Sequence, residues 1–119
     1  MRCKTLKSKD TARIAVEAAS DKQATDVVML DVKKICGFAD YFVLCSGESD
    51  RQLNAIIDSV EDTLASKGVK ARSREGAPDS GWVLIDYGDV VVHVFSPEKR
   101  GFYDLEDLWA KAVPVVRLA

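Results

Sequence analysis

The chain has 119 residues, of which 47% are hydrophobic and 30% are charged, with 7 glycines and 3 prolines. It is long enough to bury the core of one domain and too short for two. The low glycine and proline content excludes low-complexity disorder and collagen-like repeats. The longest apolar runs stop far short of the ~20 residues that a membrane span needs. We expect a flexible N-terminus over residues 1–9, a single domain over 10–110 and a C-terminal tail over 111–119.

The charge is nearly balanced, with 17 basic and 19 acidic side chains and a net charge of −2. Nucleic-acid binders normally carry a basic stripe, so the total argues against direct nucleic-acid recognition. Residues 75–109, in contrast, hold 2 basic and 8 acidic side chains, a net charge of −6. An acidic surface of this kind is usually only solvated, but where it is functional it suits a basic protein partner.

The cysteines indicate a reducing compartment. Cys3, Cys36 and Cys45 are odd in number and lack CxxC spacing, which argues against a disulfide framework and a structural zinc site. The first residues lead into a polar segment rather than an apolar run, so no signal peptide is expected. We therefore expect a cytoplasmic protein that needs no metal or cofactor and does not associate with membranes.

The first half of the chain predicts a helix, two strands and a second helix. Asp10 or Thr11 can cap a helix that runs to about Lys22, and the apolar runs over 26–32 and 41–46 are typical of strands. Ser49 and Gln52 form a capping box. The helix that it opens carries apolar residues at helical spacing and ends near Gly68 (Leu53, Ile56, Ile57, Val60 and Leu64).

The second half predicts a hairpin between a weak strand and a last helix. The weak strand covers 69–74 and a turn-rich loop covers 75–81; the hairpin strands cover 82–86 and 90–95. The last helix follows Pro97 and carries Phe102, Leu105, Leu108 and Trp109. The order α-β-β-α-β-β-β-α predicts an α/β fold, a mixed sheet of about five strands with flanking helices.

The hairpin has one unusual face. A two-residue turn within Asp86-Tyr87-Gly88-Asp89 gives the hairpin two faces. One is ordinary core and carries Val83, Ile85, Val90, Val92 and Val94. The other face mixes apolar, aromatic and polar residues: Trp82, Leu84, Asp86, Val91, His93 and Phe95. Either a helix covers this face, which is the more frequent arrangement, or part of it stays open to bind a partner.

The signals for catalysis are weak. His93 is the only histidine, and no nucleophile signature lies beside it. The segment Ser46-Gly47-Glu48-Ser49 lies between a strand and a helix, and Asp86 and Asp89 flank a turn, which allows a small nucleotidyltransferase-like enzyme using Mg²⁺ and a nucleotide. However, no D-x-D pair follows, Glu48 opposes phosphate, and capping and turn formation explain the same residues.

The ordered set of motifs resembles the ribosomal silencing factor, or Iojap, family over about Ile14 to Trp109. The residues that carry the resemblance are Asp40-Tyr41-Phe42-Val43, Ser46-Gly47, Ser49, Arg51, Gln52, Glu75-Gly76, Gly81-Trp82, Asp86-Tyr87-Gly88-Asp89, Val92-His93, Phe95, Arg100 and Phe102-Tyr103-Asp104-Leu105-Glu106-Asp107-Leu108-Trp109.

The resemblance implies a non-enzymatic factor with a nucleotidyltransferase-like fold that lacks the catalytic carboxylates. Members bind ribosomal protein L-fourteen on the free large ribosomal subunit, sterically block joining of the small subunit and repress translation when nutrients are scarce; many are homodimers. The family's contact region corresponds to Trp82 and the turn Asp86, Tyr87, Gly88 and Asp89. We expect Trp82 to anchor the partner, Tyr87 to extend the apolar contact, and His93 and Phe95 to support it.

Overall fold

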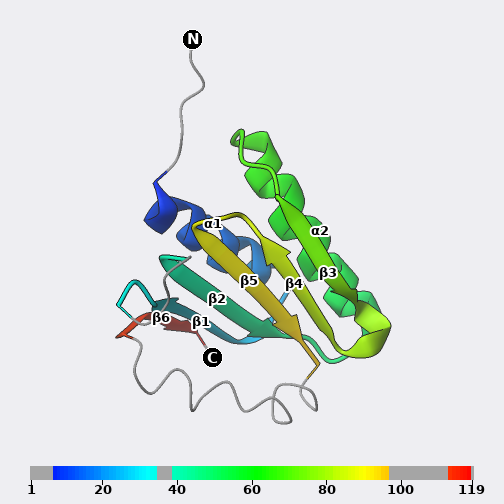
Figure 1. The fold of residues 1–119 in the computed structure, drawn as a ribbon. Helices are drawn as coiled ribbons and strands as arrows, with labels where there is room; N and C mark the ends of the chain where they lie inside the picture. Colours follow the sequence, from blue (N-terminus) through cyan, green and yellow to red (C-terminus); the bar gives the residue numbers. More distant parts are fainter. Residues whose placement is uncertain (1–6, 35–38, 97–112, 119) are drawn as a thin grey trace.

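The computed structural model describes residues 7–34, 39–96 and 113–118 (Figure 1). These residues form one six-stranded mixed sheet in the order β3-β4-β5-β2-β1-β6. β5 pairs with β2 in parallel, and the other neighbouring strands are antiparallel. The elements are α1 (Ser8–Asp21), β1 (Thr25–Asp31), β2 (Tyr41–Ser46), α2 (Asp50–Ser66), β3 (Ser73–Ala77), the 3-10 turn η1 (Pro78–Ser80), β4 (Trp82–Asp86), β5 (Val90–Phe95) and β6 (Val113–Leu118).

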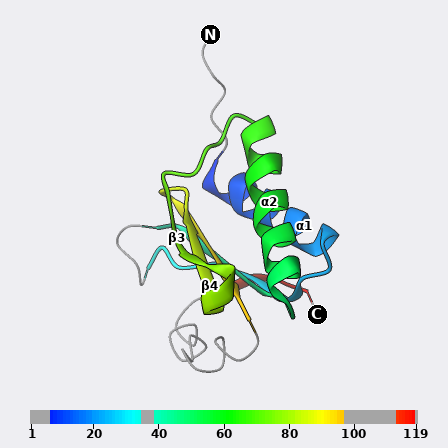
Figure 2. The same ribbon diagram turned by 90° about the vertical axis from the view of Figure 1, so that its right-hand side faces the viewer.

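Both described helices cover the same face of the sheet, as the two ribbon views show (Figures 1 and 2). α1 buries mainly small residues, which lets it approach the sheet closely, whereas α2 buries larger aliphatic ones. They pack against the inward residues of β1, β2, β4 and β5 to form the main core. Within the described ranges, no helix is long and apolar enough to cross a membrane.

The second helix confirms its predicted start and end. Ser49 is the N-cap, and its Oγ accepts a hydrogen bond of 3.1 Å from the backbone N–H of Gln52. The Gln52 side chain accepts a bond from Glu48 N–H and donates to the carbonyls of Lys22 and Gln23 at the end of α1. Gly68 adopts the left-handed conformation expected at the helix end, with φ +85°.

The predicted capping of the first helix is wrong. The helix begins at Ser8, and its N-cap is Lys7, which makes no side-chain cap hydrogen bond. Asp10 lies in the first turn, where its negative charge favours the helix dipole. The Ser8 hydroxyl instead donates to Asp40 at 2.8 Å and ties the helix to the segment before β2.

The third strand lies later in the chain than predicted. β3 covers Ser73–Ala77, within the segment assigned partly to a loop, and all five residues are exposed. Such a strand has no apolar alternation for a sequence pattern to detect. Its position follows from backbone pairing with β4, which runs from Ser73 opposite Asp86 to Ala77 opposite Trp82.

The expected C-terminal tail is also wrong for residues 113–118. They form the edge strand β6, which pairs antiparallel with β1, so the sheet has one strand more than expected. Pro114 lacks a backbone N–H, and an edge strand tolerates this because one side of its backbone needs no partner in the sheet. The predicted last helix, with Phe102, Leu105, Leu108 and Trp109, lies outside the described residues.

Candidate functional site

The hairpin turn has the predicted two-residue geometry. Tyr87 N–H donates to the Val90 carbonyl at 2.8 Å, so Gly88 and Asp89 are the two turn residues. Gly88 has φ +88°, and glycine at the first of the two positions is typical of a type II′ turn. The Asp86 side chain accepts a 2.7 Å hydrogen bond from Gly88 N–H, so Asp86 shapes the turn.

The register confirms the two predicted faces of the hairpin. Trp82 lies opposite Phe95, and Leu84 lies opposite His93, on the face away from the two helices. Burial differs sharply along this face. His93 and Phe95 are only 8% and 1% exposed, whereas Trp82 and Leu84 on β4 are half-buried. Within the hairpin, the β4 side is therefore the more accessible one, and His93 and Phe95 can act only as support; Phe42 of β2 is half-buried on the same face.

Four rings pack together on this face. His93 is parallel to Phe95, with centroids 5.9 Å apart and ring planes 3° apart, and Trp82 lies 6.2 Å from Phe95 at 10°. Phe42 of β2 meets the His93 ring edge-on at 5.2 Å and 65°. Indole Nε1–H of Trp82 also donates to Nδ1 of His93 at 3.4 Å. The Trp82 indole thus packs against the buried rings of His93 and Phe95.

Burial also sets the protonation state of the histidine. Desolvation lowers the pKa of His93 to about 4, because a buried imidazolium loses its hydration. At neutral pH the ring is therefore uncharged. With Nδ1 accepting from Trp82, the proton of the neutral ring resides on Nε2.

Tyr87 and Trp82 pack on opposite faces of the sheet. Tyr87 packs against the main core on the helix side of the sheet, whereas Trp82 packs against the cluster on the other side. Its hydroxyl oxygen is buried with no hydrogen-bond partner among the described residues. Burial, with a smaller contribution from the Glu61 carboxylate, raises the pKa of the Tyr87 phenol. The half-buried side chain thus contributes to the main core, and its expected contact with a partner stays a prediction.

The strand β3, at the other edge of the sheet from β6, adds a residue that the sequence did not assign to the site. In the β3–β4 register, Glu75 lies opposite Leu84 and Ala77 opposite Trp82, so these side chains share one face. Glu75 is exposed. We call the open part of this face, formed by Glu75, Trp82, Leu84 and Asp86, the docking strip. Alternation had already placed Leu84 on this face, but Glu75 could not be found without knowing where β3 pairs.

The residues considered for catalysis are engaged in structural roles. Ser46 is buried in β2, Asp86 holds the turn, and Asp89 is exposed while its carbonyl accepts the amides of Asp40 and Tyr41. Within the described ranges, no group of three or more histidine, cysteine or acidic side chains could hold a metal ion. These residues form a strand end, a helix cap and a turn.

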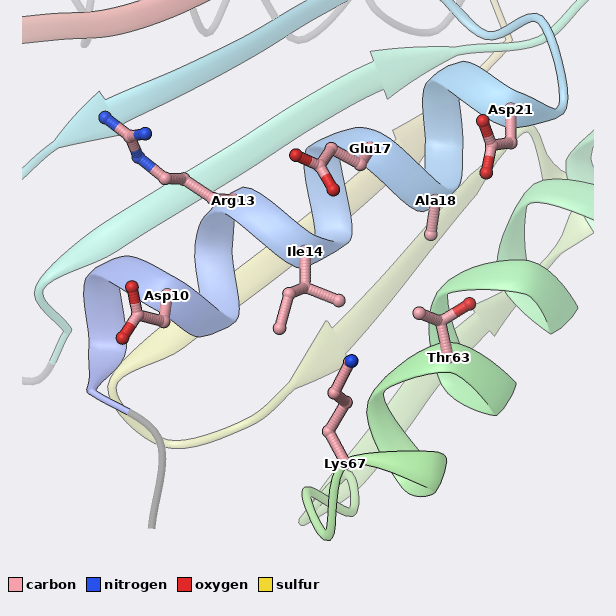
Figure 3. Close-up of a pocket in the computed structure, with 8 residues that line it drawn as sticks. All are labelled: Asp10, Arg13, Ile14, Glu17, Ala18, Asp21, Thr63 and Lys67. Atoms are coloured by element: carbon pink, nitrogen blue, oxygen red, sulfur yellow. The ribbon is translucent and has the colours of Figure 1, made fainter. Parts of the chain in front are cut away.

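A second candidate site is a groove between α1 and α2, on the opposite layer from the docking strip (Figure 3). Ile14 and Ala18 line it together with Thr63, and Lys67, which directly follows α2, points into it. Its charged residues are of both signs, with Asp10, Arg13, Glu17 and Asp21 on the α1 side. The charged side chains of the groove are exposed to solvent, where interactions between opposite charges contribute little.

Known proteins match the chain over nearly its whole length. The family model described as "Ribosomal silencing factor during starvation" matches residues 5–119. A protein named ribosomal silencing factor from Bacillus subtilis is 42% identical over 107 residues, covering 90% of this chain and 91% of that protein. The chloroplastic protein Iojap of Zea mays is 36% identical over 99 residues, which cover 83% of this chain and 43% of the longer maize protein.

A solved structure supports the same relationship. The crystal structure of a protein from Chromobacterium violaceum superposes with a TM-score of 0.84 at 34% sequence identity, covering 96% of this chain and 95% of that one. Agreement in both sequence and fold extends across the elements that build the hairpin. Other relatives include a mouse protein named mitochondrial assembly of ribosomal large subunit protein 1, which is 33% identical over 99 residues, covering 79% of this chain and 42% of that protein. The chain belongs to the ribosomal silencing factor family.

Proposed function

We propose that the protein binds ribosomal protein L-fourteen on the free large ribosomal subunit and sterically blocks joining of the small subunit, which represses translation. The action is stoichiometric and non-catalytic, takes place in the cytoplasm, and requires no nucleotide or cofactor. The observation that carries the proposal is the half-buried Trp82, held above a buried aromatic base within an acidic strip, in a chain of this family.

The composition of the docking strip supports a protein partner. Trp82 and Leu84 provide apolar area, and tryptophan is among the residues that most often anchor protein interfaces. Glu75 and Asp86 place two carboxylates beside that apolar area. A basic ribosomal protein complements this charge, which speeds association and fixes orientation more than it adds affinity.

The proposed mechanism follows from size rather than chemistry. A folded domain of about this mass, bound at the surface where two ribosomal subunits meet, occupies volume that the second subunit needs. Such exclusion requires one bound copy per large subunit and no turnover. A second copy bound to the first, as the family resemblance implies, enlarges the excluded volume without changing the mechanism.

The test is sedimentation of the purified protein with separated large subunits, separated small subunits and intact ribosomes. We expect co-migration with large subunits only, and reduced subunit joining when the protein equals the subunits in concentration. Trp82→Ala removes the anchor and should weaken large-subunit binding by about 30-fold, the equivalent of about 2 kcal/mol. Asn54→Ala, at an exposed position on α2 in the opposite layer, is the matched control and should bind like wild type.

The competing function makes opposite predictions. A small nucleotidyltransferase-like enzyme would bind Mg²⁺ and nucleotide, show turnover and ignore the Trp82 substitution. Failure of the protein to co-migrate with any ribosomal particle would overturn the proposal. Equal large-subunit binding by wild type and a folded Trp82→Ala variant would overturn the role of the docking strip.

A further inference from the structure

The contact between Trp82 and His93 has the geometry of an orienting hydrogen bond. Indole Nε1 lies 3.4 Å from imidazole Nδ1, and the two ring planes are within 8° of parallel. The indole N–H and the imidazole lone pair each lie in the plane of their own ring. Nearly parallel planes are compatible with such a bond, and the 3.4 Å between Nε1 and Nδ1 places donor and acceptor within hydrogen-bond reach.

The imidazole is itself firmly held. Phe95 lies parallel to it at 5.9 Å, Phe42 meets it edge-on at 5.2 Å, and the residue is only 8% exposed. A side chain packed in this way has little rotamer freedom. The Nδ1 lone pair of His93 therefore has one fixed position on the sheet. The Trp82 indole is half-buried and can be held in one orientation by a hydrogen bond to this lone pair.

Packing alone does not favour a histidine at this position. Nε2 of His93 is buried with no hydrogen-bond partner among the described residues. A buried unsatisfied donor carries a desolvation penalty that a phenyl ring of similar shape avoids. What the imidazole supplies and a phenyl ring cannot supply is the acceptor at Nδ1. Among the four described rings, the imidazole thus lies where its Nδ1 can accept a hydrogen bond from the half-buried indole.

We propose that His93 is a positioning residue: its neutral imidazole uses Nδ1 to hold the Trp82 indole in the orientation in which it docks. The inference rests on the proposed docking role of Trp82. Binding is stronger when the anchor is ordered beforehand, because less side-chain freedom is lost in the complex. His93 contributes to affinity in this way without touching the partner.

The hydrogen bond can be tested without ribosomes. The chain has one histidine, so the imidazole nitrogens of ¹⁵N-labelled protein can be observed by NMR without ambiguity. At neutral pH we expect a proton on Nε2 and an Nδ1 shift moved toward the hydrogen-bonded value. Trp82→Phe removes the donor and should return Nδ1 to the shift of a free acceptor. A proton on Nδ1, or an Nδ1 shift that ignores Trp82→Phe, would overturn the inference.

The consequence for docking is tested with two variants of His93. His93→Phe keeps a flat ring and removes the acceptor; we expect unchanged or higher stability together with three- to tenfold weaker binding to purified large subunits. His93→Asn leaves a cavity but carries Oδ1 near the place of Nδ1. It should be less stable than His93→Phe and yet bind more tightly. If His93 had a purely structural role, the less stable of the two variants would also bind large subunits more weakly.

The outcomes separate this inference from the proposed function. If wild type fails to bind large subunits, the proposed function fails, and the NMR result still decides whether the bond exists. If wild type binds and His93→Phe binds equally well, His93 does not position the anchor, although the proposed function stands. If affinity ranks with stability across the two variants, the positioning role is likewise overturned.

Discussion

Trp82 is the first residue of β4 and Tyr87 directly follows this strand, but their side chains pack on opposite faces of the sheet. The odd separation of five positions along extended backbone produces this arrangement, because side chains alternate between faces. The two aromatic residues of the proposed contact region are therefore expected to have different roles. Trp82 belongs to the docking strip, whereas Tyr87 belongs to the core beneath the helices.

Tyr87→Phe should separate these roles. The substitution removes a buried hydroxyl that has no described hydrogen-bond partner, so the free energy of unfolding should stay equal or rise by about 1 kcal/mol. Large-subunit binding should not change. Urea unfolding and sedimentation with large subunits measure the two effects. A large loss of binding in the folded variant would place the Tyr87 hydroxyl in the interface and contradict the assignment to the core.

Gly76 of β3 occupies a position where a larger residue should strongly destabilise the fold. It has φ +84°, and a Cβ there would lie against the backbone carbonyl oxygen of Trp82, far inside contact distance. Gly76→Ala should therefore lower the free energy of unfolding by about 3 kcal/mol, from backbone strain and steric overlap together. It should also disturb the pairing of β3 beside Trp82.

Gly68→Ala is the matched control for this substitution. Gly68 has nearly the same φ, +85°, but a Cβ there meets no atom within 4 Å. Its cost should be that of the left-handed conformation alone, about 1 kcal/mol. Thermal or urea unfolding of both variants gives the comparison. Equal destabilisation of the two variants would mean that the β3 backbone can move away from the Trp82 carbonyl oxygen and relieve the steric overlap.

Stability should depend on pH through His93. Its pKa is about 4 in the folded protein and about 6.5 when unfolded, so between these values the unfolded chain binds the proton more tightly. The free energy of unfolding should then rise with pH across this window, by up to about 3 kcal/mol, and this contribution is fully present above pH 6.5. It is lost as the pH falls toward 4.

His93→Phe isolates this contribution from that of the carboxylates. Urea unfolding of wild type and variant at several pH values between 4 and 7 gives the difference in slope. The variant should lose less stability on acidification, because it has no imidazole to protonate. Parallel profiles for the two proteins would show that His93 keeps an ordinary pKa and that its ring is solvated.

Sequence patterns predicted the elements that carry apolar periodicity. The α2 helix, the β2, β4 and β5 strands and the two faces of the hairpin all follow from spacing and turn chemistry, and the structure confirms them. The strand predicted over 69–74 lies at Ser73–Ala77 as β3, because Ser-Arg-Glu-Gly-Ala has no buried face and its position depends on pairing with β4. β6 lies within the predicted tail over 111–119, and its proline is compatible with a position at the edge of the sheet.

The two faces of the hairpin were predicted, but the packing of the side chains on them was not. Alternation placed Trp82, His93 and Phe95 on one face, yet it could not show which of them are buried. The bond between Trp82 and His93 depends on side-chain rotamers and on a diagonal contact across two strands, and neither is encoded in a local pattern. The same holds for Glu75, which reaches the strip only through a strand pairing.

Asp86 combines two roles that substitution can separate. Its carboxylate accepts the Gly88 N–H at 2.7 Å and also places negative charge on the docking strip. Asp86→Asn keeps an acceptor and removes the charge, whereas Asp86→Ala removes both. We expect Asp86→Asn to unfold within about 0.5 kcal/mol of wild type and Asp86→Ala to lose about 1 kcal/mol, as measured by urea unfolding.

Binding should follow the charge instead. Both variants should associate with large subunits two- to fivefold more weakly at low ionic strength, and the difference from wild type should shrink as salt screens the carboxylate. Asp89→Asn, at an exposed turn position, serves as a comparison for charge outside the strip. Wild-type binding by Asp86→Asn at all salt concentrations would limit Asp86 to shaping the turn, and the docking strip would then bind through Trp82 and Leu84 without this carboxylate.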